Sequence, residues 1–187
     1  MTSIDIKQAS EALSQIDDIV RRVRQSRIYD IASQIMIAAG VLVLAGNLAT
    51  YIAPRYSPYI WISINILNVA AAAVISIAGS RRTGVRAFDF RVLVAFLLFY
   101  GFGVLCTDVL GHFGPREMGA FWPIYFMLFY VLAGLWFGHA FIAIGVAISV
   151  LTLIGYFFIT GFAFLLWMAA VNGGGLILSG LWMRWGE

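Results

Sequence analysis

Six long apolar stretches alternate with short polar connections along most of this chain. They cover residues 29–51, 59–79, 92–111, 120–137, 139–158 and 165–185. Each approaches the roughly 20 apolar residues with which an α-helix crosses a bilayer. The connections hold turn residues such as Pro54 and Pro58, or the dipeptide Gly138-His139. The pattern predicts an all-α, polytopic membrane protein whose core is a bundle of six transmembrane helices.

The first residues follow another pattern, so we divide the chain into residues 1–28 and a transmembrane domain over 29–187. Between residues 3 and 27, apolar residues recur at alternating spacings of three and four, as in heptad repeats. These are Ile6, Ala9, Leu13, Ile16, Val20 and Val23. The pattern predicts a cytoplasmic amphipathic helix. It either lies on anionic headgroups, folds against the bundle's cytoplasmic loops, or binds a protein partner or a second copy.

The last apolar stretch has an unusual centre. Asn172 is followed by Gly173, Gly174 and Gly175. Glycine weakens a helix in water, but in lipid small residues let two helix backbones come close, and an amide can bond to a neighbouring helix. The sequence therefore predicts that this helix is the central packing element. It singles out Gly174 as a position where a large side chain would disrupt the bundle.

Composition and charge support a membrane location and give an orientation. The chain is 62% hydrophobic with a mean hydropathy of +0.93, whereas soluble domains are about 45–50% apolar. Of the 12 Lys and Arg residues, ten fall in residues 1–28, in the 80–91 loop or at the C-terminus, and only Arg55 and Arg116 fall elsewhere. The positive-inside rule then predicts that both termini are cytoplasmic, in a bacterial inner membrane. The net charge of +3 reflects this topology and predicts no nucleic-acid partner.

The sequence argues against an enzyme. Cys106 is the single cysteine, and the two histidines, His112 and His139, fall at opposite predicted ends of the bundle, so no metal or haem ligand set is expected. The single lysine, Lys7, precedes every apolar stretch, which argues against a retinal Schiff base. Known catalytic motifs are absent from the sequence. We therefore expect no catalytic residues, no cofactor and no metal.

The segment CTDVLGHFGPRE holds the strongest candidate site. Apart from Asp30 at the edge of the first apolar stretch, Asp108 is the one acid inside an apolar stretch, and intramembrane acids are costly and often functional. His112 follows four residues later, on the same helix face if the helix continues, and Arg116 and Glu117 come next. A histidine beside a carboxylate can change charge in the physiological pH range. The cluster is either an outward-facing sensor or ligand site, or an interfacial set in which Asp108 pairs with His112 or Arg116.

Four amides inside the apolar stretches form a second candidate site. They are Asn47, Asn65, Asn68 and Asn172. Asn65 and Asn68 are three residues apart and share a helix face. The amides either line a polar cavity or solute path, or make hydrogen bonds between helices, which are worth about 1 kcal/mol or less each.

Two apolar motifs carry a resemblance. FWPIYFMLFYVLAGLWFG and WMAAVNGGGLILSGLWMRWG resemble the C-terminal half of small uncharacterised six-span bacterial inner-membrane proteins that are associated with helix-turn-helix regulators. The resemblance implies a bacterial accessory role and no named functional residues. We expect a regulatory, interaction or sensory protein of undetermined ligand. The partners would be the lipid bilayer and, through residues 3–27, a cytoplasmic protein or a second copy. The alternative is a small-solute channel or transporter.

Overall fold

The computed structural model describes residues 3–83, 90–111 and 113–185, which are helical apart from short connections. The helices are α1 (Ser3–Ile52), a 3₁₀ turn η1 (Pro54–Tyr56), α2 (Ser57–Thr83), α3 (Phe90–Val109), α4 (Pro115–Phe137), α5 (His139–Phe158), α6 (Phe162–Met168), a π-helical segment η2 (Ala169–Gly174) and α7 (Gly175–Trp185). The all-α prediction is confirmed over these residues.

Within the described ranges, five helical segments are long and apolar enough to cross a membrane. They are Tyr29–Ile52, Pro54–Gly79, Pro115–Trp136, His139–Phe158 and Phe162–Trp185. A shorter apolar segment, Val94–Val109, lies in α3. Large apolar side chains are exposed on the outside of the bundle, including Leu98 at 70% and Phe158 at 80%. Exposed apolar surface on this scale would be unfavourable in water and suits contact with lipid tails. The chain is a helical membrane protein.

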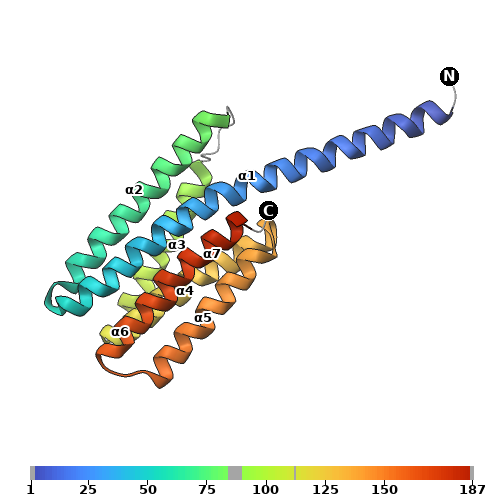
Figure 1. Ribbon diagram of the computed structural model, residues 1–187. Helices are drawn as coiled ribbons and strands as arrows, with labels where there is room; N and C mark the ends of the chain where they lie inside the picture. Colours follow the sequence, from blue (N-terminus) through green and yellow to red (C-terminus); the bar gives the residue numbers. More distant parts are fainter. Residues whose placement is uncertain (1–2, 84–89, 112, 186–187) are drawn as a thin grey trace.

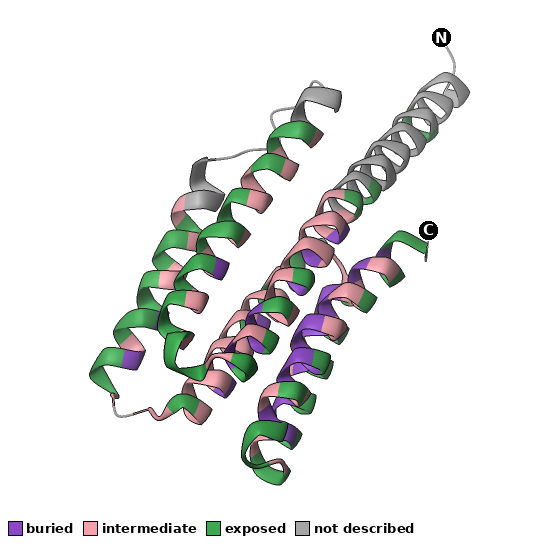
Figure 2. Ribbon diagram, turned by 60° about the vertical axis from the view of Figure 1, so that its left-hand side comes forward, coloured by how far each residue is buried: buried purple, intermediate pink, exposed green. Residues whose placement is uncertain are grey.

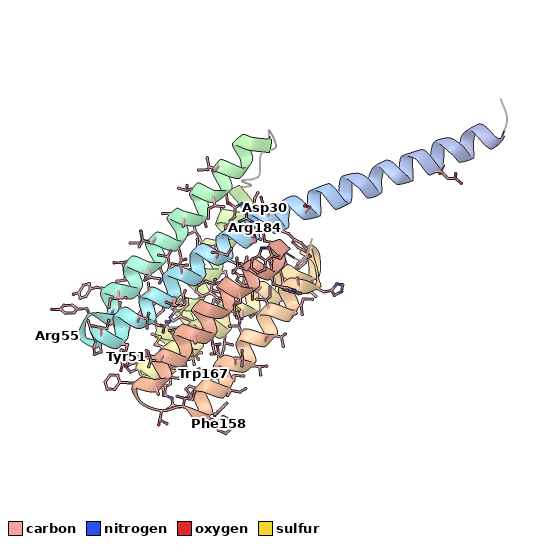
Figure 3. The ribbon with its side chains drawn as sticks, in the orientation of Figure 1. Asp30, Tyr51, Arg55, Phe158, Trp167 and Arg184 are labelled. Carbon is pink, nitrogen blue, oxygen red and sulfur yellow. The ribbon has the colours of Figure 1, made fainter. Side chains whose placement is uncertain are left out.

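Successive long helices run in opposite directions (Figure 1). One end of the bundle carries the C-terminus and the start of α5, and α1 continues far beyond the bundle at this end. Asp30 and Arg184 lie at this end, whereas Tyr51, Arg55 and Phe158 lie at the other (Figure 3). Both glycine turns that connect the later helices have positive φ, at 133° for Gly138 and 66° for Gly161, a backbone conformation that glycine adopts without strain.

The predicted boundary near residue 28 is not a break in the helix. The segment predicted as a separate amphipathic helix over 3–27 and the first apolar stretch form one continuous helix, α1, of 50 residues. Neither glycine nor proline occurs between residues 3 and 39, so no residue type that ends or kinks a helix interrupts the backbone. The helix therefore continues through the point where the sequence changes from polar to apolar.

The chain ends in one long helix built from α6, η2 and α7. The glycine triplet does not end this helix, because the backbone widens there into a π-helical segment. The segment packs tightly against α1: a Cβ on Gly173 would lie 2.5 Å from the Cβ of Leu44 and 2.7 Å from its Cα. A Cβ on Gly180 would lie 2.7 Å from the backbone oxygen of Ser33. These contacts confirm the predicted central packing helix.

The choice of Gly174 as the critical glycine was wrong. A Cβ on Gly174 would have no heavy atom within 4 Å apart from its own chain neighbours and helix backbone. Its neighbour Gly173 is the glycine in contact with α1. The three glycines are consecutive, so their spacing could not show which one points to the neighbouring helix. The π-helical winding also shifts the faces relative to a regular α-helix.

Aromatic rings separate α3 from α4. The rings of Phe99 and Tyr125 stack with centroids 4.1 Å apart, and those of Tyr100 and Trp122 with centroids 5.2 Å apart. The Tyr125 hydroxyl donates a hydrogen bond to the backbone oxygen of Phe99 at 2.7 Å. Helix α3 is therefore held to the bundle by rings that project from both helices, and one of these rings also bonds to the backbone.

Candidate functional site

The first candidate surface is the part of α1 that extends beyond the bundle (Figure 1). Residues 3–28 are helical, and at 1.5 Å per residue they reach roughly 40 Å from the membrane part of the helix. Ser10, Glu11 and Ser26 are exposed. The helix continues from its membrane segment and leaves the described part of the bundle (Figure 1). The backbone of residues 3–27 thus extends away from the described part of the bundle.

The membrane edge of α1 carries a small polar cluster. Asp30 is exposed, and its Oδ1 accepts a hydrogen bond from Nε2 of Gln34 at 3.2 Å. The buried Ser33 hydroxyl donates to the backbone oxygen of Asp30 at 2.8 Å. These bonds are local to one turn of α1.

The described residues of the cluster predicted around Asp108 have different surroundings. Asp108 is exposed near the end of α3, with no hydrogen bond or ion pair to its side chain within the described residues. His112, its predicted partner, lies outside the described residues. Glu117 lies in the first turn of α4, with Oε2 close to Gly114. Whether Asp108 and His112 act together stays a prediction, and Arg116 is engaged elsewhere.

Arg116 joins α4 to the connection between α5 and α6. Its guanidinium donates hydrogen bonds to the backbone oxygens of Tyr156 and Ile159, the latter at 2.7 Å. It also lies over the rings of Tyr156 and Phe164, at 5.3 and 5.5 Å from their centroids. The two oxygens belong to the C-terminal turn of α5, where the helix dipole favours a cation. Arg116 therefore caps α5 from a neighbouring helix, which is a structural role at the bundle's end.

The side chains of the four amides do not bond to one another within the described residues. The side chains of Asn47 and Asn65 donate to backbone oxygens four residues earlier, Val43 at 2.9 Å and Trp61 at 2.8 Å. Asn68 is half-buried on α2. Of the four, only Asn172 makes a described side-chain bond to another helix. This local bonding satisfies an amide in lipid without requiring a polar path.

Asn172 instead forms part of a buried polar cluster at the bundle's centre. The Thr152 hydroxyl on α5 donates to its Oδ1 at 3.3 Å, and its Nδ2 lies 3.5 Å from the Met168 sulfur. Thr152 is 0% exposed and Asn172 4%. Sequence analysis missed Thr152, because a threonine in an apolar helix can bond to its own backbone and gives no signal of a partner.

An open groove lies between α5 and α7. It has a volume of about 320 Å³ and is lined mainly by apolar and small residues, including Ala143, Ala147, Gly175 and Ser179. An open apolar groove on the outside of a membrane bundle is the surface that lipid tails fill. It lacks the converging polar groups that fix a soluble ligand.

These features place the chain in a class, the helical membrane proteins, with a glycine-packed centre and a helix that extends from one end. Comparisons with protein-family models, curated proteins and solved structures found no match for it.

Proposed function

We propose that this chain is a bacterial inner-membrane interaction protein with a regulatory role, whose partner binds the extended part of α1. One observation carries the proposal: α1 is a single helix that joins the packed core to residues 3–28 without a break. A partner bound outside the membrane would therefore be rigidly connected to the helix that packs against Gly173 and Gly180. No catalytic role, cofactor or metal is part of the proposal.

The proposed topology has six spans, with α3 as the sixth spanning helix and both termini in the cytoplasm. Helix α3 has 20 residues, about 30 Å at 1.5 Å each, which matches the thickness of the bilayer core. The alternating directions of the helices (Figure 1) support this count. So does the charge bias: Arg184 lies at the end from which α1 extends, and Arg55 at the other (Figure 3).

Cysteine accessibility tests this orientation. In a Cys106→Ala background, a cysteine at Gly84 should be protected from an impermeant thiol reagent in intact cells, and one at Ser57 should be labelled. Labelling of Gly84→Cys without labelling of Ser57→Cys would reverse the topology and place the extended helix outside the cell.

The heptad pattern favours a protein partner over the membrane surface. A helix that lies on headgroups runs in the membrane plane, which would require a sharp bend near residue 28, and α1 has no glycine or proline there. A row of apolar residues at a/d spacing is instead the surface with which one helix packs against another. Residues 3–27 therefore suit a helical partner.

Affinity capture tests the partner. We expect full-length protein, solubilised in mild detergent, to retain a partner that the double variant Leu13→Asp, Val20→Asp loses. Glu11→Gln, on another face of the same helix, is the matched control and should keep it. Retention of every partner by the double variant would contradict the proposal, provided that the variant inserts into the membrane like the wild type.

The second candidate is a small-solute channel or transporter, and the buried Thr152–Asn172 pair favours it. Polar side chains beside a π-helical segment in a membrane helix are a common feature of solute and ion sites. Uptake into proteoliposomes that Asn172→Leu abolishes and Asn68→Leu reduces would support a transporter. An absence of uptake by the wild type would leave the pair with a packing role.

A further inference from the structure

The open groove and the buried polar pair lie next to each other along α5 and the last helix. The groove runs between α5 and α7 (Figure 1), and Ile148 and Gly175 are among its lining residues. Thr152 follows Ile148 by four residues, and Asn172 precedes Gly175 by three. Such spacings keep to one face of a helix. The hydrogen-bonded pair of Thr152 and Asn172 therefore lies about one turn beyond the groove on both helices.

The buried amide of Asn172 has bonding capacity that the described residues do not use. An asparagine side chain has two N–H donors and an oxygen with two lone pairs. Among the described residues, Asn172 has a long bond from the Thr152 hydroxyl, at 3.3 Å, and a contact with the Met168 sulfur at 3.5 Å. Sulfur is a weak acceptor, and Asn172 is only 4% exposed. Because a buried polar group with too few bonds is costly, a further polar group at this position would be stabilising.

The lining of the groove limits the chemistry of a ligand. Its nine residues are uncharged and mostly apolar, and neither member of the polar pair carries a charge. A charged ligand would lie inside the membrane without an opposite charge, which is unfavourable. A neutral oxygen atom, in contrast, can accept a hydrogen bond from the Asn172 amide. The ligand that fits has an apolar body and one neutral hydroxyl or carbonyl group.

We propose that the groove and the Thr152–Asn172 pair form one binding site for such a neutral, membrane-dissolved molecule. Its apolar body lies along the exposed Ala143 and Ala147, and its oxygen accepts a hydrogen bond from Asn172. The groove faces the lipid, so the molecule enters from the side and does not have to cross from water, as a transported solute would. The inference goes beyond the proposed function and does not depend on a partner of α1.

The Ile148 side chain controls the step from the groove to the pair. A Cβ on Gly175 would lie 3.4 Å from Cγ1 and Cδ1 of Ile148, so this side chain lies against the glycine. Ile148 is 3% exposed. Because Gly175 has no side chain, a change of the Ile148 rotamer widens the passage without moving a helix.

Photoaffinity labelling in proteoliposomes tests the site. The probe is a long-chain alcohol that carries a diazirine on its chain, and mass spectrometry maps the labelled residues. We expect labels on the groove lining of α5 and α7. Dodecanol should reduce this labelling, whereas dodecane at the same mole fraction in the lipid should leave it unchanged. Equal competition by the alcohol and the alkane would overturn the proposal, because the groove would then take apolar chains whether or not they carry a polar group.

Variants test the two parts of the site separately. Ala147→Phe fills the groove from an exposed position and should remove the labelling, whereas Ala45→Phe, at an exposed position on α1, is the matched control and should keep it. Asn172→Leu removes the polar partner, and we expect it to weaken competition by dodecanol about fivefold. Wild-type labelling of Ala147→Phe, or unchanged competition in Asn172→Leu, would contradict the proposal. If Asn172→Leu fails to insert, the comparison of dodecanol with dodecane on the wild-type protein decides the same point.

Discussion

Two helix contacts in this bundle are built in opposite ways. Where α1 crosses the last helix, small residues bring backbone against backbone: a Cβ on Gly40 would lie 2.7 Å from the backbone oxygen of Gly173. Where α3 lies beside α4, rings fill the space, and a Cβ on Gly103 would meet the rings of Tyr125 and Trp122 at 2.8 and 3.0 Å. The first contact joins rigid backbones and the second joins movable side chains.

The distribution of buried residues matches the difference between these two contacts. Buried positions gather where α1 faces the last helix, whereas the side formed by α2 and α3 is mostly exposed (Figure 2). In lipid there is little hydrophobic gain from bringing helices together, so close packing and interhelical bonds carry the stability. We infer that the glycine crossing is the rigid core of the bundle and that α3 is its most loosely attached helix.

The largest effect is expected for Gly173→Leu. Its side chain would have to enter the space of the Leu44 backbone, and we expect destabilisation of about 3 kcal/mol or more, at the upper end of the range for overpacking. Gly174→Leu is the control, because the adjacent position is open, and it should melt in detergent within about 1 kcal/mol of the wild type. Equal losses from the two variants would show that the π-helical backbone, and not the contact with α1, makes leucine unfavourable.

The variants Gly40→Ala and Gly103→Ala each add a single methyl group, one at the glycine crossing and one between α3 and α4. At Gly40 the methyl meets backbone atoms of the last helix, and we expect a loss of about 1–3 kcal/mol. At Gly103 it meets rings that can turn aside, so the loss should stay below about 1 kcal/mol. Thermal melting of both variants in the same detergent measures the difference. A larger loss at Gly103 would place the rigid contact on the α3 side.

The smallest effects come from removing one hydroxyl in each region. Tyr125→Phe removes the bond to the backbone of Phe99 and should cost about 1 kcal/mol. Thr152→Val removes the bond to Asn172 and should cost about 0.6 kcal/mol, the average for such bonds in a membrane. Hydrogen exchange should show that the tyrosine change affects α3 alone, whereas the threonine change affects both α5 and η2. Uniform exchange across the molecule after Tyr125→Phe would contradict a loosely attached α3.

Sequence reasoning predicted the helices well, whereas the bonding partners of the candidate site residues came from the structure. Helix α5 matches its predicted stretch of 139–158, since long apolar runs bounded by glycine leave few alternatives. Arg116 was grouped with Asp108 by proximity in the chain, yet it bonds to Tyr156 and Ile159, about forty residues away. Spacing along one helix reports which residues share a face and not which helix lies opposite.

The amino-acid sequence by itself determined that this chain forms membrane helices, because apolar length and charge distribution act locally along the chain. It also determined that glycines would allow a close crossing. Only the tertiary structure decided that Gly173 and not Gly174 makes the contact. It alone paired Thr152 with Asn172 and joined residues 3–27 to the first membrane helix without a break. These outcomes depend on the rotation of one helix against another. A π-helical turn changes that rotation, and the hydrophobic periodicity of the sequence does not reveal such a turn.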